Sequence, residues 1–191
     1  MYNLVVFASG NGTTLQAIID HINSKELNAK ISIVISDNPN AFALERAKKA
    51  GIATYVIKST SPENIDTELV NLLKDYSIDL IILAGYLKLI KESLIKKYTI
   101  INTHPSLLPK YGGKGMFGLN VHRAVINAKE KESGVTVHFV NEKYDSGDII
   151  RQTKVPVFPT DTAEDLCARV QAAEKIQLIE ILKDFINGKI N

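Results

Sequence analysis

Short apolar runs alternate along the first half of the chain with segments that have the spacing of amphipathic helices. The runs are rich in β-branched residues and apolar at consecutive positions, which is typical of central strands in a parallel sheet. They are Tyr2–Ala8, Ile31–Ile35, Tyr55–Ile57 and Leu80–Leu83. The helical segments between them are Leu15–Ser24, Ala41–Ala50 and Ile65–Asp75. This order predicts an open α/β sheet with right-handed crossovers.

The pattern changes in the second half. Thr99–Thr103 is predicted to be one more central strand, followed by an irregular stretch and a helix near Val121–Ala128. "SGVTVHFV" then alternates apolar and polar positions, and "GDIIRQTKVPV" follows a tight turn, so both predict antiparallel strands added to the sheet. Thr160–Asn187 predicts a long helix with an N-cap in "TDTAEDL". We expect one domain, residues 1–191, with a Rossmann-like, mostly parallel twisted sheet and helices on both faces.

The composition is that of an ordinary globular protein, with 45% hydrophobic and 23% charged residues. A formal net charge of +2, without a basic run that contains aromatics, argues against nucleic-acid binding. Cys167 is the only cysteine, which excludes an intrachain disulfide and a Cys-based metal site. No apolar run approaches the ~20 residues of a membrane span, and no signal-peptide pattern opens the chain. A cytoplasmic protein is expected.

A glycine loop, "SGNGTT", joins the first strand to the first helix. Gly10 and Gly12 allow close approach of an anion, which the N–H groups at the start of the helix would face. A dinucleotide site is an alternative, with Asp37 as the ribose-binding acid, although Leu15 occupies the third glycine position of G-x-G-x-x-G. A turn without any ligand is another. We favour a single phosphate.

An amide and an imidazole follow at the end of the strand in "INTHPSLLP". Asn102 and His104 are two positions apart, so an extended backbone directs both side chains to the same face. Asp145 lies in a glycine-containing turn, "YDSGDII", where it is either a turn cap or a functional carboxylate. Together the three would supply an oxyanion donor, a proton carrier and a tuning carboxylate. Spacing alone does not bring Asp145 to His104.

These residues resemble the phosphoribosylglycinamide formyltransferases, folate-dependent enzymes of purine synthesis. The resemblance covers nearly the whole chain, through "VVFASGNGTTLQAIID", "IILAGYLKLI", "INTHPSLLPKYGG", "SGVTVHFVNEKYDSGDII" and "VPVFPTDTAEDLCARVQAAE". It implies formyl transfer from 10-formyltetrahydrofolate, as co-substrate, to the amine of a glycinamide ribonucleotide. It implies no metal, small-molecule partners only, and a monomer or weak homodimer. Residues 1–98 would bind phosphate, and residues 99–191 would bind folate and carry out the chemistry.

The resemblance also implies the residues of each site. The catalytic set is Asn102, His104 and Asp145. The ribonucleotide set is Gly12, Thr13, Thr14, Gln171, Ala172, Ala173 and Glu174. The folate set is Leu87, Lys88, Leu89, Ile90, Asn102, Asn141, Glu142, Lys143, Tyr144 and Asp145.

Four features depart from the family pattern. Thr14 stands where many members carry Asn, and Lys88 replaces a frequent Arg, which would remove a bidentate contact to the folate tail. Pro62 occupies a position that is often Arg. The stretch "GGKGMFGLN" before the helix that carries His122 is longer than usual. None of the four removes a catalytic group.

Three rival functions remain. Methionyl-tRNA formyltransferase would need further C-terminal sequence, and formyltetrahydrofolate hydrolase usually has an additional N-terminal module. A non-catalytic nucleotide-binding module would explain Gly10 and Gly12 but would leave Asn102, His104 and Asp145 without a role.

Overall fold

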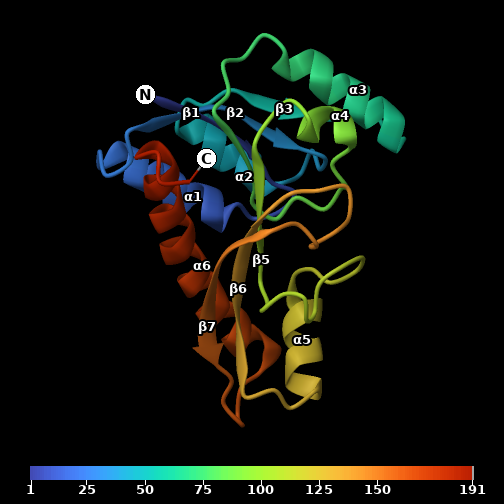
Figure 1. The fold of residues 1–191 in the computed structure, drawn as a ribbon, viewed down its shortest axis with the longest axis vertical. Coiled ribbons are helices and arrows are strands. Elements are labelled where there is room, and N and C mark those ends of the chain that lie inside the picture. Colours follow the sequence, from blue (N-terminus) through green and yellow to red (C-terminus); the bar gives the residue numbers. More distant parts are fainter. Residues whose placement is uncertain (191) are drawn as a thin grey trace.

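The computed structural model describes residues 1–190 and contains a seven-stranded sheet in the order β3-β2-β1-β4-β5-β6-β7 (Figure 1). The strands are β1 (Tyr2–Phe7), β2 (Ala29–Ser36), β3 (Thr54–Val56), β4 (Leu80–Leu83), β5 (Ile100–His104), β6 (Glu132–Phe139) and β7 (Ile149–Pro156). The helices are α1 (Thr13–Asn23), α2 (Phe42–Lys49), α3 (Pro62–Leu73), α4 (Glu92–Ile95), α5 (Leu119–Asn127) and α6 (Ala163–Ile186). Strands β1 to β5 are parallel, and β6 and β7 are antiparallel. The predicted fold class is therefore confirmed.

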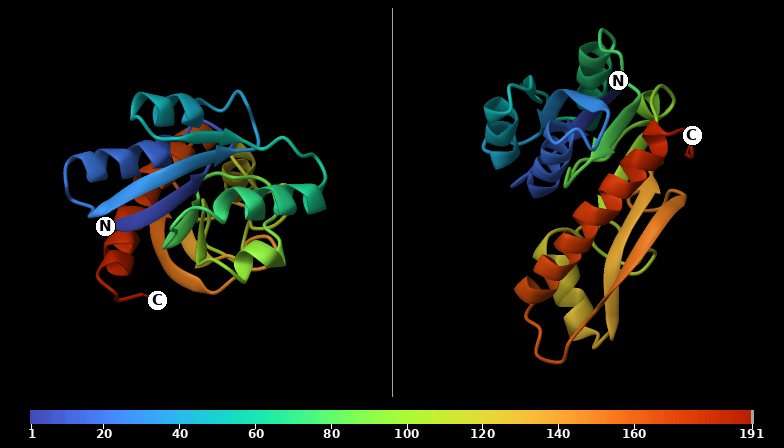
Figure 2. Two further views of the ribbon diagram at one scale, coloured as in Figure 1. Left: turned by 90° about the horizontal axis from the view of Figure 1, so that it is seen from above. Right: turned by 90° about the vertical axis from the view of Figure 1, so that its left-hand side faces the viewer.

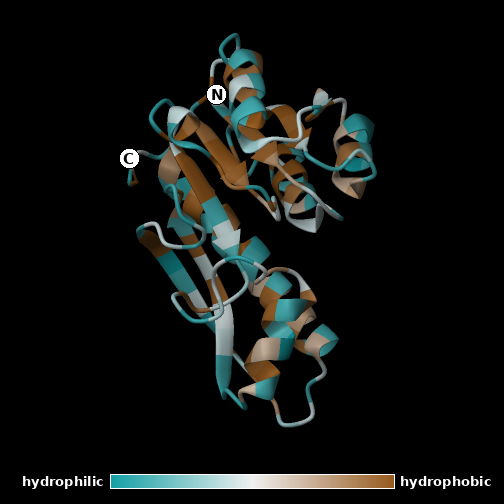
Figure 3. Cartoon of the chain, turned by 90° about the vertical axis from the view of Figure 1, so that its right-hand side faces the viewer, coloured by the Kyte–Doolittle hydropathy of each residue, from teal (hydrophilic) through white to brown (hydrophobic). Residues whose placement is uncertain are grey.

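The parallel strands are buried on both faces because helices cover both sides of the sheet (Figure 2). Along β1, Leu4 and Val6 belong to one core cluster with residues of α1, α2 and α6. Val5 and Phe7 point the other way and pack in a second cluster with residues of α3. The parallel strands are accordingly hydrophobic along their length, whereas the antiparallel part mixes hydrophilic and hydrophobic positions (Figure 3).

Helix α6 connects the two parts of the sheet. It has 24 residues and begins with a capping box, in which Thr162 and Asp165 exchange side-chain and backbone hydrogen bonds. Its buried residues include Leu166 and Val170 beside β6 and β7, and Leu182 and others in the core cluster of β1 and β4. It therefore runs beside both the parallel and the antiparallel strands (Figure 2).

The starts of α3 and α6 differ most from the sequence prediction. Helix α3 begins at Pro62, three residues before the predicted start at Ile65, because Ser61 caps it and proline suits the first helical position. Helix α6 begins at Ala163, after the predicted Thr160, because the cap is Thr162. Helix α4 lies within "KESLIKKY", a stretch whose charges suit the solvated face of a helix, and it spans four residues. None of the helices in residues 1–190 is long and apolar enough to cross a membrane.

Candidate active site

The glycine loop lies at the carboxyl ends of β1 and β4, where the strand order reverses and open α/β sheets bind ligands. Gly12 has φ of 72°, and a Cβ at this position would lie 2.7 Å from the Cα and Cβ of Ala43. Only glycine fits there without strain. Helix α1 begins at the next residue, Thr13, and Gly12 provides no side-chain cap. The N–H groups of its first turn are therefore suited to an anion.

Asp37, the acid that would bind a ribose in a dinucleotide site, is hydrogen-bonded within the protein. Asp37 Oδ1 accepts a hydrogen bond of 2.5 Å from the hydroxyl of Ser9, which in turn accepts one of 3.3 Å from the N–H of Leu87. These bonds connect the glycine loop to the segment after β4. The carboxylate thus has a structural task, which favours the single-phosphate interpretation over the dinucleotide one.

The structure brings Asn102, His104 and Asp145 together. Asn102 and His104 lie on one face of β5, as the two-residue spacing predicts, and Asp145 lies in the turn between β6 and β7. Asp145 Oδ1 is 3.4 Å from His104 Nδ1 and 3.3 Å from Asn102 Nδ2. The side chains of His104 and Asp145 are 5% and 10% exposed, so this contact is largely shielded from water.

Asp145 is held by its own backbone conformation and by a neighbouring loop. It has φ of 51°, and its Oδ2 accepts a hydrogen bond of 2.8 Å from the N–H of Gly113. Burial would raise the pKa of Asp145, but the hydrogen bond and charge of His104, the nearby ring of His138 and the Gly113 N–H together lower it well below its usual range. The carboxylate therefore stays ionised.

His138 is a fourth polar group in this cluster that the sequence reasoning missed. It lies on β6 directly opposite Asn102, with its Nε2 3.0 Å from Asn102 Nδ2 and 3.7 Å from Asp145 Oδ1. Its Nδ1 is 2.7 Å from the carbonyl oxygen of Phe139, which can only accept, so Nδ1 carries the proton. The amide nitrogen of Asn102 can only donate, so His138 Nε2 is its acceptor, and this contact fixes the orientation of the amide. The strand pattern of "SGVTVHFV" contained His138, but its partner follows only from strand pairing.

The second nitrogen of His104 also has a partner. His104 Nε2 is 2.8 Å from the carbonyl oxygen of Tyr111, at the start of the glycine-rich stretch before α5. The two ring nitrogens thus face a carboxylate and a carbonyl, neither of which can donate, and this arrangement suits an imidazolium. His122 on α5 is 1% exposed, and burial together with the charge of His104 lowers the pKa of His122 to about 4, so His122 is neutral near pH 7.

A pocket lies beside Asn102 and Asp145 and contains most of the predicted folate residues. Lys88, Leu89, Ile90, Asn102, Asn141, Lys143, Tyr144 and Asp145 line it. Four further lining residues were not predicted, namely Leu83, Tyr86, His138 and Val140. The predicted Leu87 and Glu142 are exposed and do not line it. The pocket thus combines apolar walls with convergent polar groups, as small-molecule sites do.

The predicted ribonucleotide segment on α6 divides into two groups. Glu174 reaches the glycine loop, since its Oε1 is 3.2 Å from the hydroxyl of Thr14. Gln171 instead donates to the sulfur of Cys167, Ala172 is exposed, and Ala173 packs against an apolar cluster. Among these four residues, Glu174 therefore makes the side-chain contact to the loop.

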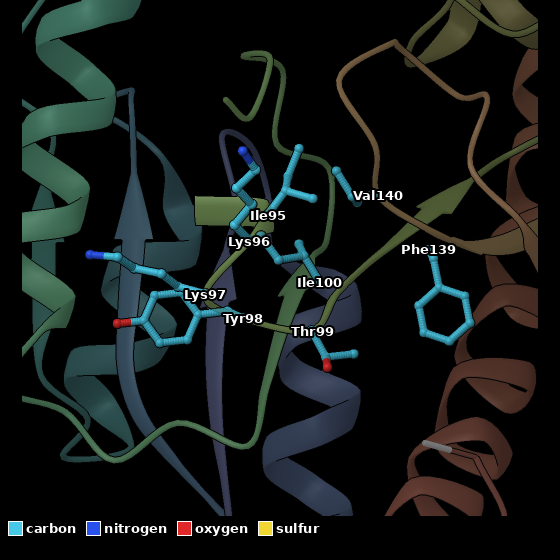
Figure 4. Close-up of a pocket in the computed structure, with 8 residues that line it drawn as sticks. All are labelled: Ile95, Lys96, Lys97, Tyr98, Thr99, Ile100, Phe139 and Val140. Carbon is cyan, nitrogen blue, oxygen red and sulfur yellow. The ribbon is translucent and has the colours of Figure 1, made fainter. Parts of the chain in front are cut away.

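A second pocket lies at the start of β5, but polar side chains do not converge on it. Figure 4 shows Lys96 and Lys97 extending away from it, and Tyr98 and Phe139 pointing to opposite sides. Within residues 1–190 no group of three or more His, Cys, Asp or Glu side chains is placed to hold a metal ion. The absence of a metal from the chemistry stays a prediction.

Comparison with known proteins identifies the family. The formyl transferase family matches residues 2–182. The chain belongs to this family. It is 38% identical to the phosphoribosylglycinamide formyltransferase of Escherichia coli (strain K12), over 98% of this chain and 89% of that protein. It is 40% identical to the enzyme of the same name from Haemophilus influenzae, over 100% and 90%.

Solved structures of formyl transferases agree with this fold. The structure of glycinamide ribonucleotide transformylase 1 from Symbiobacterium toebii has a TM-score of 0.90 at 37% identity and covers 98% of this chain and 89% of its own. Phosphoribosylglycinamide formyltransferase from Bacillus halodurans also reaches 0.90, at 34% identity over 99% and 97%. The formyl transferase fold predicted from the sequence motifs is therefore the fold of this chain.

Proposed function

We propose that this chain transfers the formyl group of 10-formyltetrahydrofolate to the amine of N1-(5-phospho-D-ribosyl)glycinamide. The products are the formylglycinamide ribonucleotide and tetrahydrofolate, and the reaction belongs to de novo purine biosynthesis. The observation that carries the proposal is the convergence of Asn102, His104 and Asp145 beside the pocket. Relatives that match over nearly the full chain and bear the name of this activity support it.

The two substrates would occupy opposite sides of this cluster. The ribose phosphate would lie at the N–H groups of Gly12, Thr13 and Thr14, where the helix dipole attracts an anion. The folate would lie in the pocket of Lys88, Leu89, Ile90, Asn141, Lys143 and Tyr144. The glycinamide amine and the formyl carbon would then meet beside His104, which turns a bimolecular reaction into a reaction of bound, oriented groups.

The chemistry forms one C–N bond and breaks another. The amine nitrogen bonds to the formyl carbon, and the carbonyl oxygen becomes an oxyanion. Asn102 and the imidazolium of His104 would donate hydrogen bonds to that oxygen, each of a type that contributes roughly 3 kcal/mol at the barrier. The bond from the carbon to the folate nitrogen then breaks, and this nitrogen takes up a proton as the amine loses one, with His104 as the carrier. The ionised Asp145 stabilises the positive charge of the imidazolium.

Substrate binding must replace one hydrogen bond of Asn102 and one of His104 in the free protein. Asn102 Nδ2 has its hydrogens directed at His138 and Asp145, and His104 Nε2 donates to the Tyr111 carbonyl. A donor becomes available to the oxyanion when one of these bonds is released. The Tyr111 bond is the natural candidate, since the following stretch has left-handed backbone at Gly113, Gly115 and elsewhere.

One assay tests the proposal. Tetrahydrofolate should be released from 10-formyltetrahydrofolate only when the glycinamide ribonucleotide is present. Release without an acceptor would indicate a hydrolase, and release with methionyl-tRNA would indicate a tRNA formyltransferase. No release under any of these conditions would indicate a binding protein. The oligomeric state, the cytoplasmic location and the division into residues 1–98 and 99–191 stay predictions.

Gly12→Ala tests the phosphate loop. The added Cβ would meet Ala43, and the left-handed backbone of Gly12 would be strained, so the N–H groups of the loop should move. We expect KM for the ribonucleotide to rise at least ~10-fold, equivalent to ~1.4 kcal/mol of binding, with KM for the folate within ~2-fold. Gly51→Ala is the matched control, because Gly51 also has a left-handed φ of 70° but lies after α2, outside the loop, and a Cβ there has nothing within 4 Å. Equal increases in both KM values would contradict a phosphate site, and circular dichroism would check that both variants fold.

A further inference from the structure

Glu174 receives hydrogen bonds from two distant parts of the chain. The hydroxyl of Thr14, in the first turn of α1, lies 3.2 Å from Glu174 Oε1. The hydroxyl of Thr103, on β5, lies 2.5 Å from the same oxygen. Both threonines are buried, with 8% and 7% of their surfaces exposed. Three separate elements therefore meet at one carboxylate oxygen.

Thr103 takes part in this cluster because of strand geometry. It lies between Asn102 and His104 on β5, so its side chain leaves the opposite face of the strand. The catalytic pair thus faces Asp145, while Thr103 faces Glu174 on α6. Glu174 lies on α6 at this point, where the helix contacts both α1 and the sheet.

The hydrogen bonds leave the two oxygens of Glu174 in different states. A hydroxyl has one hydrogen to donate, so two hydroxyls that both donate to Oε1 require an oxygen that carries no proton. Among residues 1–190, none donates a hydrogen bond to Oε2. One oxygen is therefore fixed by the protein, and the other is available to a ligand.

We propose that Thr14 and Thr103 are positioning residues that fix the carboxylate of Glu174 so that its Oε2 accepts a hydrogen bond from a hydroxyl or amine of the phosphorylated substrate. This inference rests on the proposed function, and it assigns roles to two side-chain hydroxyls that the loop and strand motifs do not. Thr14 has a double task, since its N–H faces the phosphate site and its hydroxyl holds Glu174. Thr14 thereby sets the distance between the phosphate and Glu174 Oε2. The site selects substrates that have a hydrogen-bond donor at this distance from their phosphate.

The electrostatic surroundings of Glu174 make the two hydroxyls important. Burial raises the pKa of Glu174, and the bonds from the two threonines oppose this shift. The charges of Lys175 and His104 also lower the pKa of Glu174. The thiol of Cys167, on the same helix, faces Glu174 as well. Loss of one hydroxyl should therefore favour the protonated form of Glu174 and displace its Oε2 at the same time.

Thr103→Val is the central variant of the test, because valine keeps the shape and removes the hydroxyl. We expect KM for the ribonucleotide to rise about 10-fold, as for the loss of a hydrogen bond to a charged group. KM for the folate should stay within ~2-fold. Thr103→Ser should restore the ribonucleotide KM, and Thr14→Val should raise it like Thr103→Val. Thr99→Val, at an exposed position just before β5, is the control and should change neither KM.

A second measurement separates this inference from the proposed function. The carboxyl carbon of Glu174, followed by NMR in protein with ¹³C-labelled glutamate and without any substrate, should titrate at higher pH in Thr103→Val than in the wild type. An unchanged titration, or equal increases in both KM values, would overturn the positioning role. If the wild-type protein transfers no formyl group to the ribonucleotide, the proposed function fails, while the titration still decides whether the threonines control Glu174.

Discussion

His104→Ala should lower kcat by roughly 10²- to 10⁴-fold, the range for loss of a general acid–base group. His104 is the one group in the cluster that can both donate to the oxyanion and carry the proton to the folate nitrogen. Its ring lies against Asp145 on one side and the Tyr111 carbonyl on the other, so its position is well defined before substrate binds. KM for either substrate should change by less than ~5-fold, because the substrates are held mainly by the glycine loop and the folate pocket.

Steady-state kinetics with each substrate varied in turn would measure this effect. His21→Ala is a suitable control, since His21 lies in the last turn of α1, partly exposed and remote from the cluster. His104→Gln adds information, because an amide donates a hydrogen bond but does not carry a proton. We expect His104→Gln to recover part of the lost rate if oxyanion stabilisation contributes separately. Turnover near the wild-type value in His104→Ala would remove the acid role from the mechanism.

Local periodicity predicted much of the fold and half of the catalytic cluster. The apolar runs that became β1, β2 and β4 are buried on both faces, so their sequence signal is strong. Asn102 and His104 could be placed on one face from the two-residue repeat of a strand alone. Such features depend on neighbours within a few residues, and a sequence displays these directly.

The rest depends on tertiary pairing. His138 meets Asn102 because β6 pairs antiparallel with β5 in one particular register, and a register shift follows Val137 in its pairing with β7. No spacing in the sequence reveals that register. Thr14 and Glu174 are 160 positions apart, so their contact could be suggested only through the family resemblance. In the same way, the family resemblance implied Asp145 as a partner of His104, but the distance between the two side chains follows only from the folded structure.

Asp145→Asn should lower kcat by roughly 10²- to 10³-fold, a loss of the size seen when a preorganised electrostatic contact is removed. Asparagine has nearly the same shape and can still accept from the Gly113 N–H, so the turn should keep its conformation. The change removes the charge that faces His104 and His138. The positive charge on the ring of His104 then loses its partner, so the dependence of kcat on pH should differ from that of the wild type. An unchanged pH profile would contradict the tuning role of Asp145, whatever the change in rate.

The stability of this variant provides an independent test with a fixed sign. The pKa of Asp145 is lowered in the folded protein, so its ionised form stabilises the fold above its unfolded pKa of ~3.9, and this stabilisation disappears as pH falls through the folded value. Asp145→Asn should therefore cost about 3 kcal/mol of unfolding free energy at pH 7, the magnitude for breaking a buried charge pair. The difference from the wild type should shrink below pH 4. Denaturant unfolding at pH 7 and pH 3 would measure it, and a difference that grows in acid would mean that the carboxylate is not paired in the folded state. If kcat falls while this stability difference is absent, Asp145 acts only with substrate bound, and the contact with His104 in the free protein is not the source of its effect.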